Sequence, residues 1–331
     1  MNLKSDLSQK PAFPGGKPWH ALGPALREIF GGRTRRIPLD AGFTCPNRDG
    51  SIATGGCRYC DAEGARAQFV QPELPVREQW TSGLERSLKR DPRTTRFIAY
   101  FQAYTNTYAP PEILRETYGA IAESLPDHLR EEAELSAIAI GTRPDCLNEA
   151  VLDVLEELAA DHYLWIEMGL QSMRNASLEA MNRGHSVEQF IDAAKRLNAR
   201  KIRWVGHVIF GLPGDSRNDM LASAPLMNEL QAWGVKLHNL YIDKHSQLAY
   251  DYKHSKIRIL DRDEYLDLLV DYLSRLNPEI LIHRLMGEAP RDRLIAPAWS
   301  LKKSEFLNAL EHYMVEKDVW QGKDISNADK S

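Results

Sequence analysis

Short runs of apolar residues alternate along this chain with longer segments in which apolar residues recur every three or four positions. The short runs predict strands, and the longer segments predict amphipathic helices. Predicted strands cover residues 36–39, 97–101, 135–140, 163–170, 202–210, 235–242 and 280–285. Predicted helices cover residues 76–88, 111–124, 148–158, 187–197, 219–232 and 262–276, with a further helical region from Ala176. This alternation indicates an α/β fold of β-α units with a parallel sheet.

Two architectures fit the alternation, an open doubly wound sheet and a complete or partial (β/α) barrel. No Gly-x-Gly-x-x-Gly follows the first strand, which removes the usual dinucleotide signature. The polar motifs fall after the strands, where the active-site loops of a barrel lie. We expect residues 1–18 to form a mobile polar arm, residues 19–300 to form the α/β domain, and residues 301–331 to form a helix with a polar tail.

The composition excludes several classes of protein. The 331 residues are 43% hydrophobic and 27% charged, which is typical of a soluble globular protein. The net charge of -4 gives no global reason to bind nucleic acid, so any RNA contact needs a local basic patch. The first 16 residues lack the apolar core of a secretory signal, and no apolar run is long enough to span a bilayer. We therefore expect a cytoplasmic protein.

Three of the four cysteines lie in one turn-rich segment. Cys45, Cys57 and Cys60 form a C-x11-C-x2-C pattern, and the residues between them are rich in Pro, Asn, Asp and Gly. Soft thiolates select zinc or iron–sulfur clusters, and structural zinc normally takes four ligands. The segment indicates an iron–sulfur cluster with one open iron, although a zinc site completed by a histidine and three free thiols are alternatives. For Cys146, which stands apart, we expect a buried apolar role.

Polar side chains follow each of the middle strands. Amide, hydroxyl and charged groups occur there, and Glu167 lies within an apolar strand, where a carboxylate needs a partner. Asp145 is a possible cap for the next helix. Glycines after the fifth strand let the backbone approach a flat ligand closely. Candidate binding residues are Gln102, Thr105, Thr142, Arg143, Glu167, Gln171, His207 and Gly211.

Taken together, these motifs resemble the radical SAM superfamily. The resemblance rests on the cysteine loop, on Gly169-Leu-Gln-Ser172, on Asn182-Arg-Gly-His185 and on Ile209-Phe-Gly-Leu-Pro-Gly214. The whole chain is most similar to the YhcC/YtqA-type group, through YFQAYTNTY, GTRPDC and NRGHS. That group is related to the elongator subunit 3 catalytic core and to oxygen-independent coproporphyrinogen oxidase. The resemblance covers about residues 17–310.

The resemblance implies a partial (β/α)6 TIM-like barrel and two cofactors. Cys45, Cys57 and Cys60 would bind a [4Fe–4S] cluster, whose open iron takes S-adenosylmethionine. An electron donor such as flavodoxin or ferredoxin would reduce the cluster. By motif match, Gln102 and Thr105 would lie near the methionine amino group of S-adenosylmethionine. Gln171 and Arg183 match positions that contact its ribose or carboxylate in relatives, and Glu167 and the 209–211 backbone are further candidates. Two positions depart from the pattern, because relatives often have glutamate where Gly141 stands and some have aspartate where His207 stands.

The resemblance also suggests a substrate. Elongator-type relatives act on carbon 5 of the wobble uridine of tRNA, and the YhcC/YtqA-type group is tied to conversion of 5-carboxymethylaminomethyluridine to 5-aminomethyluridine. The alternatives are a radical SAM enzyme acting on a small molecule or peptide, and a zinc-stabilised RNA-binding module without catalysis. Candidate basic surfaces contain Arg33, Arg35, Arg36, Lys201, Arg203, Arg291, Arg293, Lys302 and Lys303, although solvated charge explains most of these residues.

Overall fold

A computed structural model describes residues 10–60, 66–67, 69–122, 125 and 127–325. The chain divides into two compact units. We call residues 26–170 and 178–205 the cysteine-loop unit, and residues 1–25, 171–177 and 206–331 the C-terminal unit.

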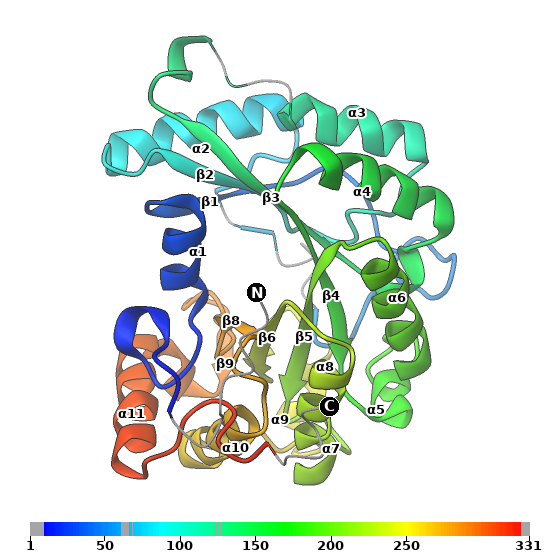
Figure 1. Ribbon diagram of the computed structural model, residues 1–331. Helices are drawn as coiled ribbons and strands as arrows, with labels where there is room; N and C mark the ends of the chain where they lie inside the picture. The colour runs from blue at the N-terminus through cyan, green and yellow to red at the C-terminus, as the bar shows by residue number, and fades with distance from the viewer. Residues whose placement is uncertain (1–9, 61–65, 68, 123–124, 126, 326–331) are drawn as a thin grey trace. The chain divides into compact units, whose positions relative to one another are not determined.

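Seven strands form the main sheet. They are β1 (Thr34–Leu39), β2 (Arg96–Phe101), β3 (Glu134–Thr142), β4 (Leu164–Gln171), β5 (Arg203–Phe210), β6 (Gly234–Asn239) and β8 (Leu281–Arg284). Their order in the sheet, β1-β2-β3-β4-β5-β6-β8, is their order along the chain (Figure 1). A parallel sheet with sequential strands joined by helices is the arrangement of a partial (β/α) barrel. The predicted fold class is therefore confirmed.

Buried residues dominate strands β2, β3 and β4 of the cysteine-loop unit. Strands β1 to β4 pair in parallel, with Ile37 opposite Ala99, Ala99 opposite Ile138, and Ile138 opposite Leu164. All eight residues of β4 are buried. A parallel strand covered on both faces requires such a continuous apolar run, which explains why these strands do not alternate between apolar and polar residues.

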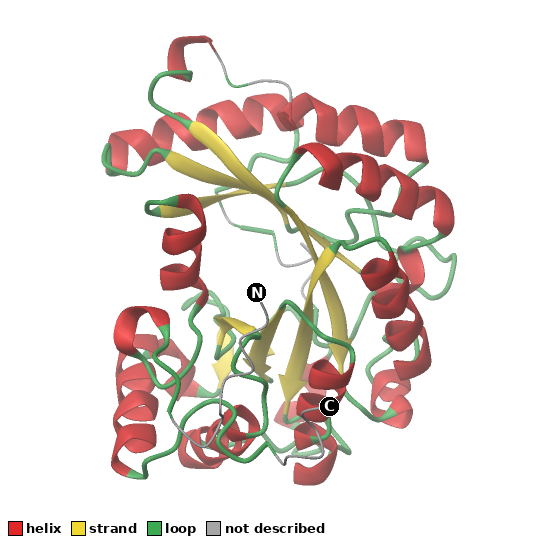
Figure 2. Ribbon diagram, in the orientation of Figure 1, coloured by secondary structure: helices red, strands yellow, loops and turns green. Residues whose placement is uncertain are grey.

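Helices α2 (Val76–Arg90), α3 (Pro111–Ala122) and α4 (Glu149–Asp161) cover one face of β1 to β3 (Figure 2). The unit also contains α6 (Val187–Ala199) and the short helices η2 (Asp127–Leu129) and η3 (Pro144–Cys146). Side-chain caps fix where two of these helices begin. Asn148 accepts a hydrogen bond from the backbone of Val151, and Ser186 forms a capping box with Gln189.

The C-terminal unit contains helices α7 (Arg217–Leu221), α8 (Ser223–Glu229), α9 (Leu248–Lys253), α10 (Arg262–Ser274) and α11 (Lys303–Glu316), with η1 (Pro14–Gly16) and η4 (Ala298–Leu301). Helices α1 (Leu22–Phe30) and α5 (Asn175–Ala180) cross the boundary between the units. The rings of Tyr265, Trp299 and Phe306 stack at centroid distances of 5.1 to 5.6 Å. Tyr265 and Phe306 are buried and Trp299 is half-buried, so the three rings join α10, η4 and α11 into one apolar cluster.

The two ends of the described chain meet in the C-terminal unit. The buried Gln321 side chain donates to the carbonyls of Asn277 and Ile280 and accepts from the backbone N–H of His20. Of the predicted N-terminal arm, residues 1–9 lie outside the described residues. Within residues 10–18, Phe13 is buried and stacks on His20.

Two predicted elements are wrong in extent. The strand predicted over 235–242 ends at Asn239, and β7 (Ile242–Asp243) pairs instead in antiparallel fashion with β9 (Leu294–Ala296). The helix predicted over 219–232 is split between α7 and α8 at Ala222. No helix among the described residues is long and apolar enough to cross a membrane.

Candidate cofactor site

The cysteine loop is held by its own backbone. The N–H groups of Arg48 and Asp49 donate to the carbonyl of Cys45, at 2.7 and 3.2 Å, and the N–H of Cys60 donates to the carbonyl of Cys57 at 2.9 Å. None of the three cysteines is in a disulfide; Cys45 and Cys57 are buried and Cys60 is half-buried. The turns therefore keep the sulfurs on one short, folded loop.

A second segment, Met181 to His185, closes over the loop. The N–H of Arg58 donates to the carbonyl of Met181 at 3.0 Å. The Asn182 side chain donates to the carbonyl of Gly56 at 2.8 Å. Asn182 has a φ of 53°, which asparagine tolerates better than most residues. These contacts fix the cysteine loop against the residues that follow α5.

Asn47 and Gly184 fit together at the centre of this contact. The fully buried Asn47 donates from Nδ2 to the carbonyl of Arg183 at 2.9 Å. Gly184 has a φ of 73°, and a Cβ there would lie 2.5 Å from Asn47 Oδ1. Glycine is required at this position both by its conformation and by the close approach of the asparagine.

Two donors point at the sulfur of Cys57. Arg183 Nη1 lies 3.6 Å from Sγ, and Asn47 Nδ2 lies 3.5 Å from it. Burial would raise the pKa of the Cys57 thiol, but the charge and hydrogen bond of Arg183 outweigh it and lower the pKa below its ordinary value. The thiolate is the form that binds metal, so the surroundings favour a ligand at Cys57.

Arg143 and Asp145 form a buried ion pair beside this site. Arg143 Nε and Nη2 donate to the two carboxylate oxygens at 3.0 and 2.8 Å, and the arginine side chain is only 2% exposed. The remaining Nη1 is buried and has no hydrogen-bond partner in the described part of the chain. The suggestion that Asp145 caps the next helix is wrong, because Asn148 caps α4 and Asp145 is engaged by Arg143.

His185 is held in its neutral form. Arg183 Nε donates to His185 Nε2 at 2.8 Å, and Nδ1 donates to the Ser186 carbonyl at 3.1 Å. Burial first, and then the charge of Arg183, lower the pKa of His185 to about 2. An uncharged imidazole can therefore orient the guanidinium that approaches Cys57.

The residues described here contain no group of three or more His, Cys, Asp or Glu side chains that could hold one metal ion. A single-ion zinc site needs such convergence. A [4Fe–4S] cluster does not, since each cysteine binds a different iron at a separate corner.

The predicted binding residues of the cysteine-loop unit have different surroundings. Glu167 is buried, and its carboxylate accepts from the Tyr100 hydroxyl at 2.7 Å and from the Trp165 indole at 3.3 Å. The hydroxyls of Thr142 and Thr107 are 2.5 Å apart. Gln102 follows β2, and its N–H donates to the carbonyl of Leu39. The Thr105 carbonyl accepts from the N–H of Tyr108.

Three predicted residues belong to the C-terminal unit. Gln171 ends β4 with a φ of 74°. The rings of His207 and His238 lie 5.9 Å apart. The N–H of Gly211, whose φ is 89°, donates to the sulfur of Met220 at 3.1 Å. Their role in binding S-adenosylmethionine stays a prediction, as it does for the candidates in the other unit.

Sequence reasoning missed the role of Asn47, which it treated only as a turn former. The sequence did contain a signal for this role, because Asn47 directly follows Cys45 and Pro46 and so places a side-chain amide close to a candidate cluster ligand. Cys146 is buried as expected, and burial raises the pKa of its thiol to about 12. Its thiol is therefore neutral, whereas the pKa of the Cys57 thiol is lowered below its ordinary value.

Several predicted basic residues are engaged elsewhere. Arg293 is buried in an ion pair with Asp243, at 2.8 Å. Lys303 pairs with Glu288, and Lys302 pairs with Glu305. The charges of these three residues are neutralised locally, and that of Arg293 lies in a buried ion pair and not in solvent.

Comparisons with known proteins agree with the sequence motifs. A family model described as the radical SAM superfamily matches residues 48–226, and a model of the Radical_SAM C-terminal domain matches residues 232–316. YtqA of Bacillus subtilis (strain 168) is 35% identical over 318 residues, covering 93% of this chain and 92% of that protein.

More distant similarities extend to elongator-type proteins. A tRNA uridine(34) acetyltransferase of Methanocaldococcus infernus is 24% identical over 191 residues, covering 55% of this chain and 34% of that protein. The solved structure of the archaeal Methanocaldococcus infernus Elp3 has a TM-score of 0.64 and 17% identity, covering 87% of this chain and 64% of that one. This structural likeness concerns the fold. The family model and the YtqA similarity decide the identity: this chain belongs to the radical SAM superfamily.

Proposed function

We propose that Cys45, Cys57 and Cys60 hold one [4Fe–4S] cluster and that S-adenosylmethionine binds at its open iron. The family implies both cofactors. The observation that carries the assignment to these cysteines is the pair of donors at Cys57 Sγ, where Arg183 and Asn47 stabilise a buried thiolate. An isolated buried thiol, such as Cys146, has no need of such donors.

The charges around the loop fit an anionic cluster. Arg143 and Arg183 are both buried, and only one carboxylate, that of Asp145, forms an ion pair with either of them in the described part of the chain. The buried Arg143 Nη1 has a free proton to donate there. A group carrying negative charge would satisfy this donor and offset the cost of burying two cations.

The bound cofactors would supply reductive cleavage of a carbon–sulfur bond of S-adenosylmethionine. The chain supplies ligation, orientation and exclusion of water. Arg183 and Asn47 hold the Cys57 thiolate, and the Met181 to His185 segment covers the loop. Proposed contacts to S-adenosylmethionine are Gln102, Thr105, Thr142, Arg143, Glu167, Gln171, Arg183, His207 and Gly211.

Anaerobic reconstitution with iron and sulfide, followed by dithionite and S-adenosylmethionine, tests the cofactor chemistry. We expect a brown protein that forms 5′-deoxyadenosine. Bound zinc without sulfide, and no 5′-deoxyadenosine, would instead support the zinc-stabilised RNA-binding module. A flavodoxin or ferredoxin replacing dithionite would identify the physiological class of reductant.

For the substrate, we propose tRNA with a modified wobble uridine. The support is the similarity to proteins named tRNA uridine(34) acetyltransferase, which extends over about half of this chain. The chain spans only about a third of that relative, so the acetyl transfer in its name does not come with the similarity. The proposed reaction type is conversion of 5-carboxymethylaminomethyluridine to 5-aminomethyluridine.

Nucleoside analysis of tRNA from a deletion strain tests the substrate. We expect 5-carboxymethylaminomethyluridine to accumulate and 5-aminomethyluridine derivatives to fall. Unchanged wobble uridines would reject tRNA. If 5′-deoxyadenosine still formed, the substrate would be a small molecule or a peptide.

A further inference from the structure

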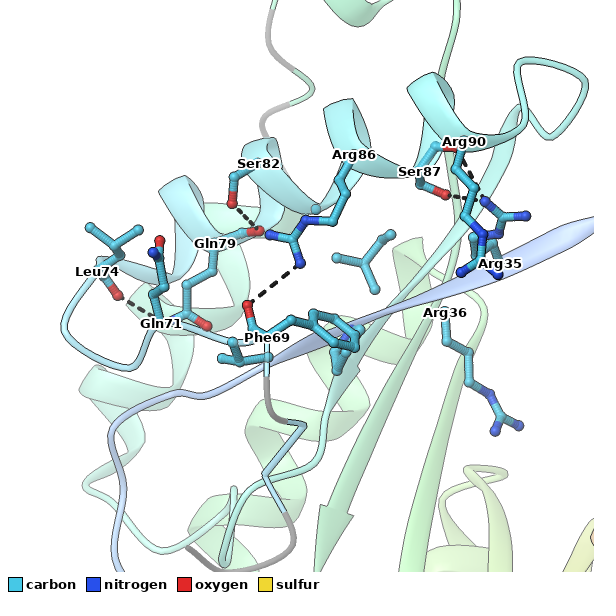
Figure 3. Close-up of a pocket in the computed structure, with 14 residues that line it drawn as sticks. Arg35, Arg36, Phe69, Gln71, Leu74, Gln79, Ser82, Arg86, Ser87 and Arg90 are labelled. Atoms are coloured by element: carbon cyan, nitrogen blue, oxygen red, sulfur yellow. Dashed lines mark hydrogen bonds between the residues drawn. The ribbon is translucent and has the colours of Figure 1, made fainter. Parts of the chain in front are cut away.

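A cavity of about 240 Å³ lies between β1, α2 and the segment from Phe69 to Leu74 (Figure 3). None of the three cysteines lines it, and neither does any residue proposed to contact S-adenosylmethionine. Its floor includes Ile37, which packs against Gly83 of α2. The cavity therefore lies on the helix side of the first strand and is a site of its own.

One wall of the cavity is a partly exposed aromatic ring. Phe69 is 57% exposed, although large apolar side chains are normally covered in a folded protein. The guanidinium of Arg86 lies 5.1 Å from the centroid of the ring, and its Nη1 donates to the Phe69 carbonyl (Figure 3). A flat ligand could stack on the uncovered part of this ring.

The charged side chains that line the cavity are all cationic. Arg35, Arg86 and Arg90 line the cavity together with Arg36, and no acidic residue is among the described residues that line it. Arg35 Nη1 donates to the carbonyl and hydroxyl of Ser87, at 3.1 and 3.0 Å, which fixes its guanidinium at the edge of the cavity. Arg36 instead turns its guanidinium toward the Tyr100 ring, 5.4 Å away.

Helix stability explains only part of this charge. Arg90 lies in the last turn of α2, where a cation interacts favourably with the helix dipole. Arg35 lies on a strand and Arg86 lies a turn earlier, so the dipole does not explain why they gather here. Asp91, 3.8 Å from Arg35, partly neutralises that arginine. Arg86 and Arg90 still place two cations at a cavity without an acidic lining, which favours an anionic ligand.

An aromatic wall beside a cluster of arginines suits a nucleotide, whose base is flat and whose phosphate is anionic. A concave site also suits a nucleotide better than the flat acidic surface of an electron-donor protein. Resting on the proposed tRNA substrate, we propose that this cavity binds an unpaired nucleotide of that RNA. The base stacks on Phe69, and Arg86 and Arg90 hold the phosphate.

A charge-matched pair of variants tests the site. Arg86→Gln with Arg90→Gln removes two charges from the cavity, whereas Arg77→Gln with Lys89→Gln removes two charges from the same helix outside it. The probe is a fluorescein-labelled single-stranded decauridylate, with an unmodified tRNA transcript as the second probe. Binding is measured by fluorescence anisotropy on the reconstituted holoenzyme over a range of salt concentrations.

We expect the cavity variant to weaken binding of both probes about tenfold and the matched variant to change it less than twofold. For the decauridylate, the cavity variant should also reduce the slope of log affinity against log salt by about 0.7, which is the loss of one single-strand phosphate contact. If both double variants weakened binding equally, the effect would come from the overall charge of the helix, and the proposed nucleotide site would be rejected.

Substitutions of Phe69 test whether a base stacks on its ring. Phe69→Leu should weaken binding of both probes about tenfold by removing the ring, and Phe69→Tyr should keep the affinity within twofold. Equal affinity of the leucine variant would contradict a stacked base. All variants should form 5′-deoxyadenosine at the rate of the parent protein, which also shows that they are folded.

The result separates this proposal from the proposed function. If the cavity variants bind both probes normally but are reduced more slowly by flavodoxin, the cavity receives the electron donor and the nucleotide site is rejected, with the tRNA reaction untouched. If the deletion strain shows unchanged wobble uridines while the cavity variants lose affinity, the nucleotide site stands and the tRNA reaction proposed above is rejected.

Discussion

Arg183 carries more of the candidate site than any other single side chain. It donates from Nη1 toward Cys57 Sγ, from Nε to His185, and from Nη2 to the carbonyl of Gly169 at 3.4 Å. A donor to a cluster thiolate stabilises the more negative, reduced state, so this arginine should raise the reduction potential of a cluster bound there.

Arg183→Met should therefore lower the midpoint potential of the cluster by about 60 mV, a factor of ten in the one-electron equilibrium. The midpoint potential of Arg183→Lys should lie between those of the parent protein and Arg183→Met, because lysine keeps the charge without the fixed geometry of the guanidinium. The measurement is an EPR-monitored redox titration without S-adenosylmethionine. Arg115→Met, which removes an exposed arginine paired with Glu157, should leave the potential unchanged. Identical potentials in all four proteins would contradict the contact.

His185 gives the site a pH dependence. Its folded-state pKa of about 2 lies below the unfolded value of 6.5. Below pH 6.5 the unfolded chain binds a proton that the folded chain does not, so the stability from this residue is complete above pH 6.5 and is lost as the pH falls.

The free energy of unfolding should accordingly fall by about 1 kcal/mol between pH 6.5 and 5.5 because of His185 alone. His185→Gln retains an acceptor for Arg183 without titrating, and it should flatten the dependence over that interval. Anaerobic urea denaturation at both pH values measures the difference. Equal slopes in the parent and the variant would show that the imidazole titrates normally.

At the scale of secondary-structure elements, Gly83 determines how closely α2 lies on β1. A Cβ at this position would lie 2.3 Å from Ile37 Cγ2. Helix propensity favours alanine over glycine by about 1 kcal/mol, but overpacking a tight contact costs about 1–3 kcal/mol. The steric cost should therefore exceed the gain in helix propensity.

Gly83→Ala is thus expected to lower the free energy of unfolding by about 1–2 kcal/mol in urea denaturation. Ile37→Ala removes the opposing methyl groups, so Gly83→Ala in that background should cost less or become stabilising. Strict additivity of the two substitutions would contradict a direct contact.

The strands were predictable because they are continuous apolar runs, and the helices because their apolar faces repeat. The break after Asn239 was not predictable, since apolar residues recur up to Ile242 although β7 pairs with β9. Pairing with a strand some fifty residues away leaves no local signal. Helix α9 was missed for a similar reason, because six residues are too few to establish a period.

In the candidate site, too, local sequence motifs were predictable and contacts between distant segments were not. The spacing of Cys45, Cys57 and Cys60 indicated a cluster loop, and the NRGHS motif marked a functional segment. Asn47 and Gly184 lie in segments more than 130 residues apart in the sequence, and their close contact depends on the fold. The spacing of motifs does not reveal such a contact. The arginines of α2 that line the cavity were missed because they read as a solvated helix face.

For the molecule as a whole, the C-terminal unit depends on its last described residues. Gln321 is fully buried, and its side chain makes three hydrogen bonds to backbone groups near residues 20, 277 and 280. Leaving such buried groups unsatisfied costs more than the bonds themselves contribute.

Gln321→Ala should lower the free energy of unfolding by about 2–4 kcal/mol. Glu316→Ala, at an exposed position five residues earlier, should change it by less than about 0.5 kcal/mol. Thermal and urea unfolding of both variants provide the comparison. A loss below 1 kcal/mol for Gln321→Ala would mean that the chain ends are not joined as described.

The central claim is that three thiolates of one loop hold a cluster whose remaining iron binds S-adenosylmethionine. Its most direct test is iron and sulfide content, with EPR of the reduced protein, in Cys57→Ala with Cys60→Ala and in Cys146→Ala. We predict four irons per chain and an EPR signal altered by S-adenosylmethionine in the parent and in Cys146→Ala, and neither in the double variant. Undiminished iron in the double variant would contradict the account.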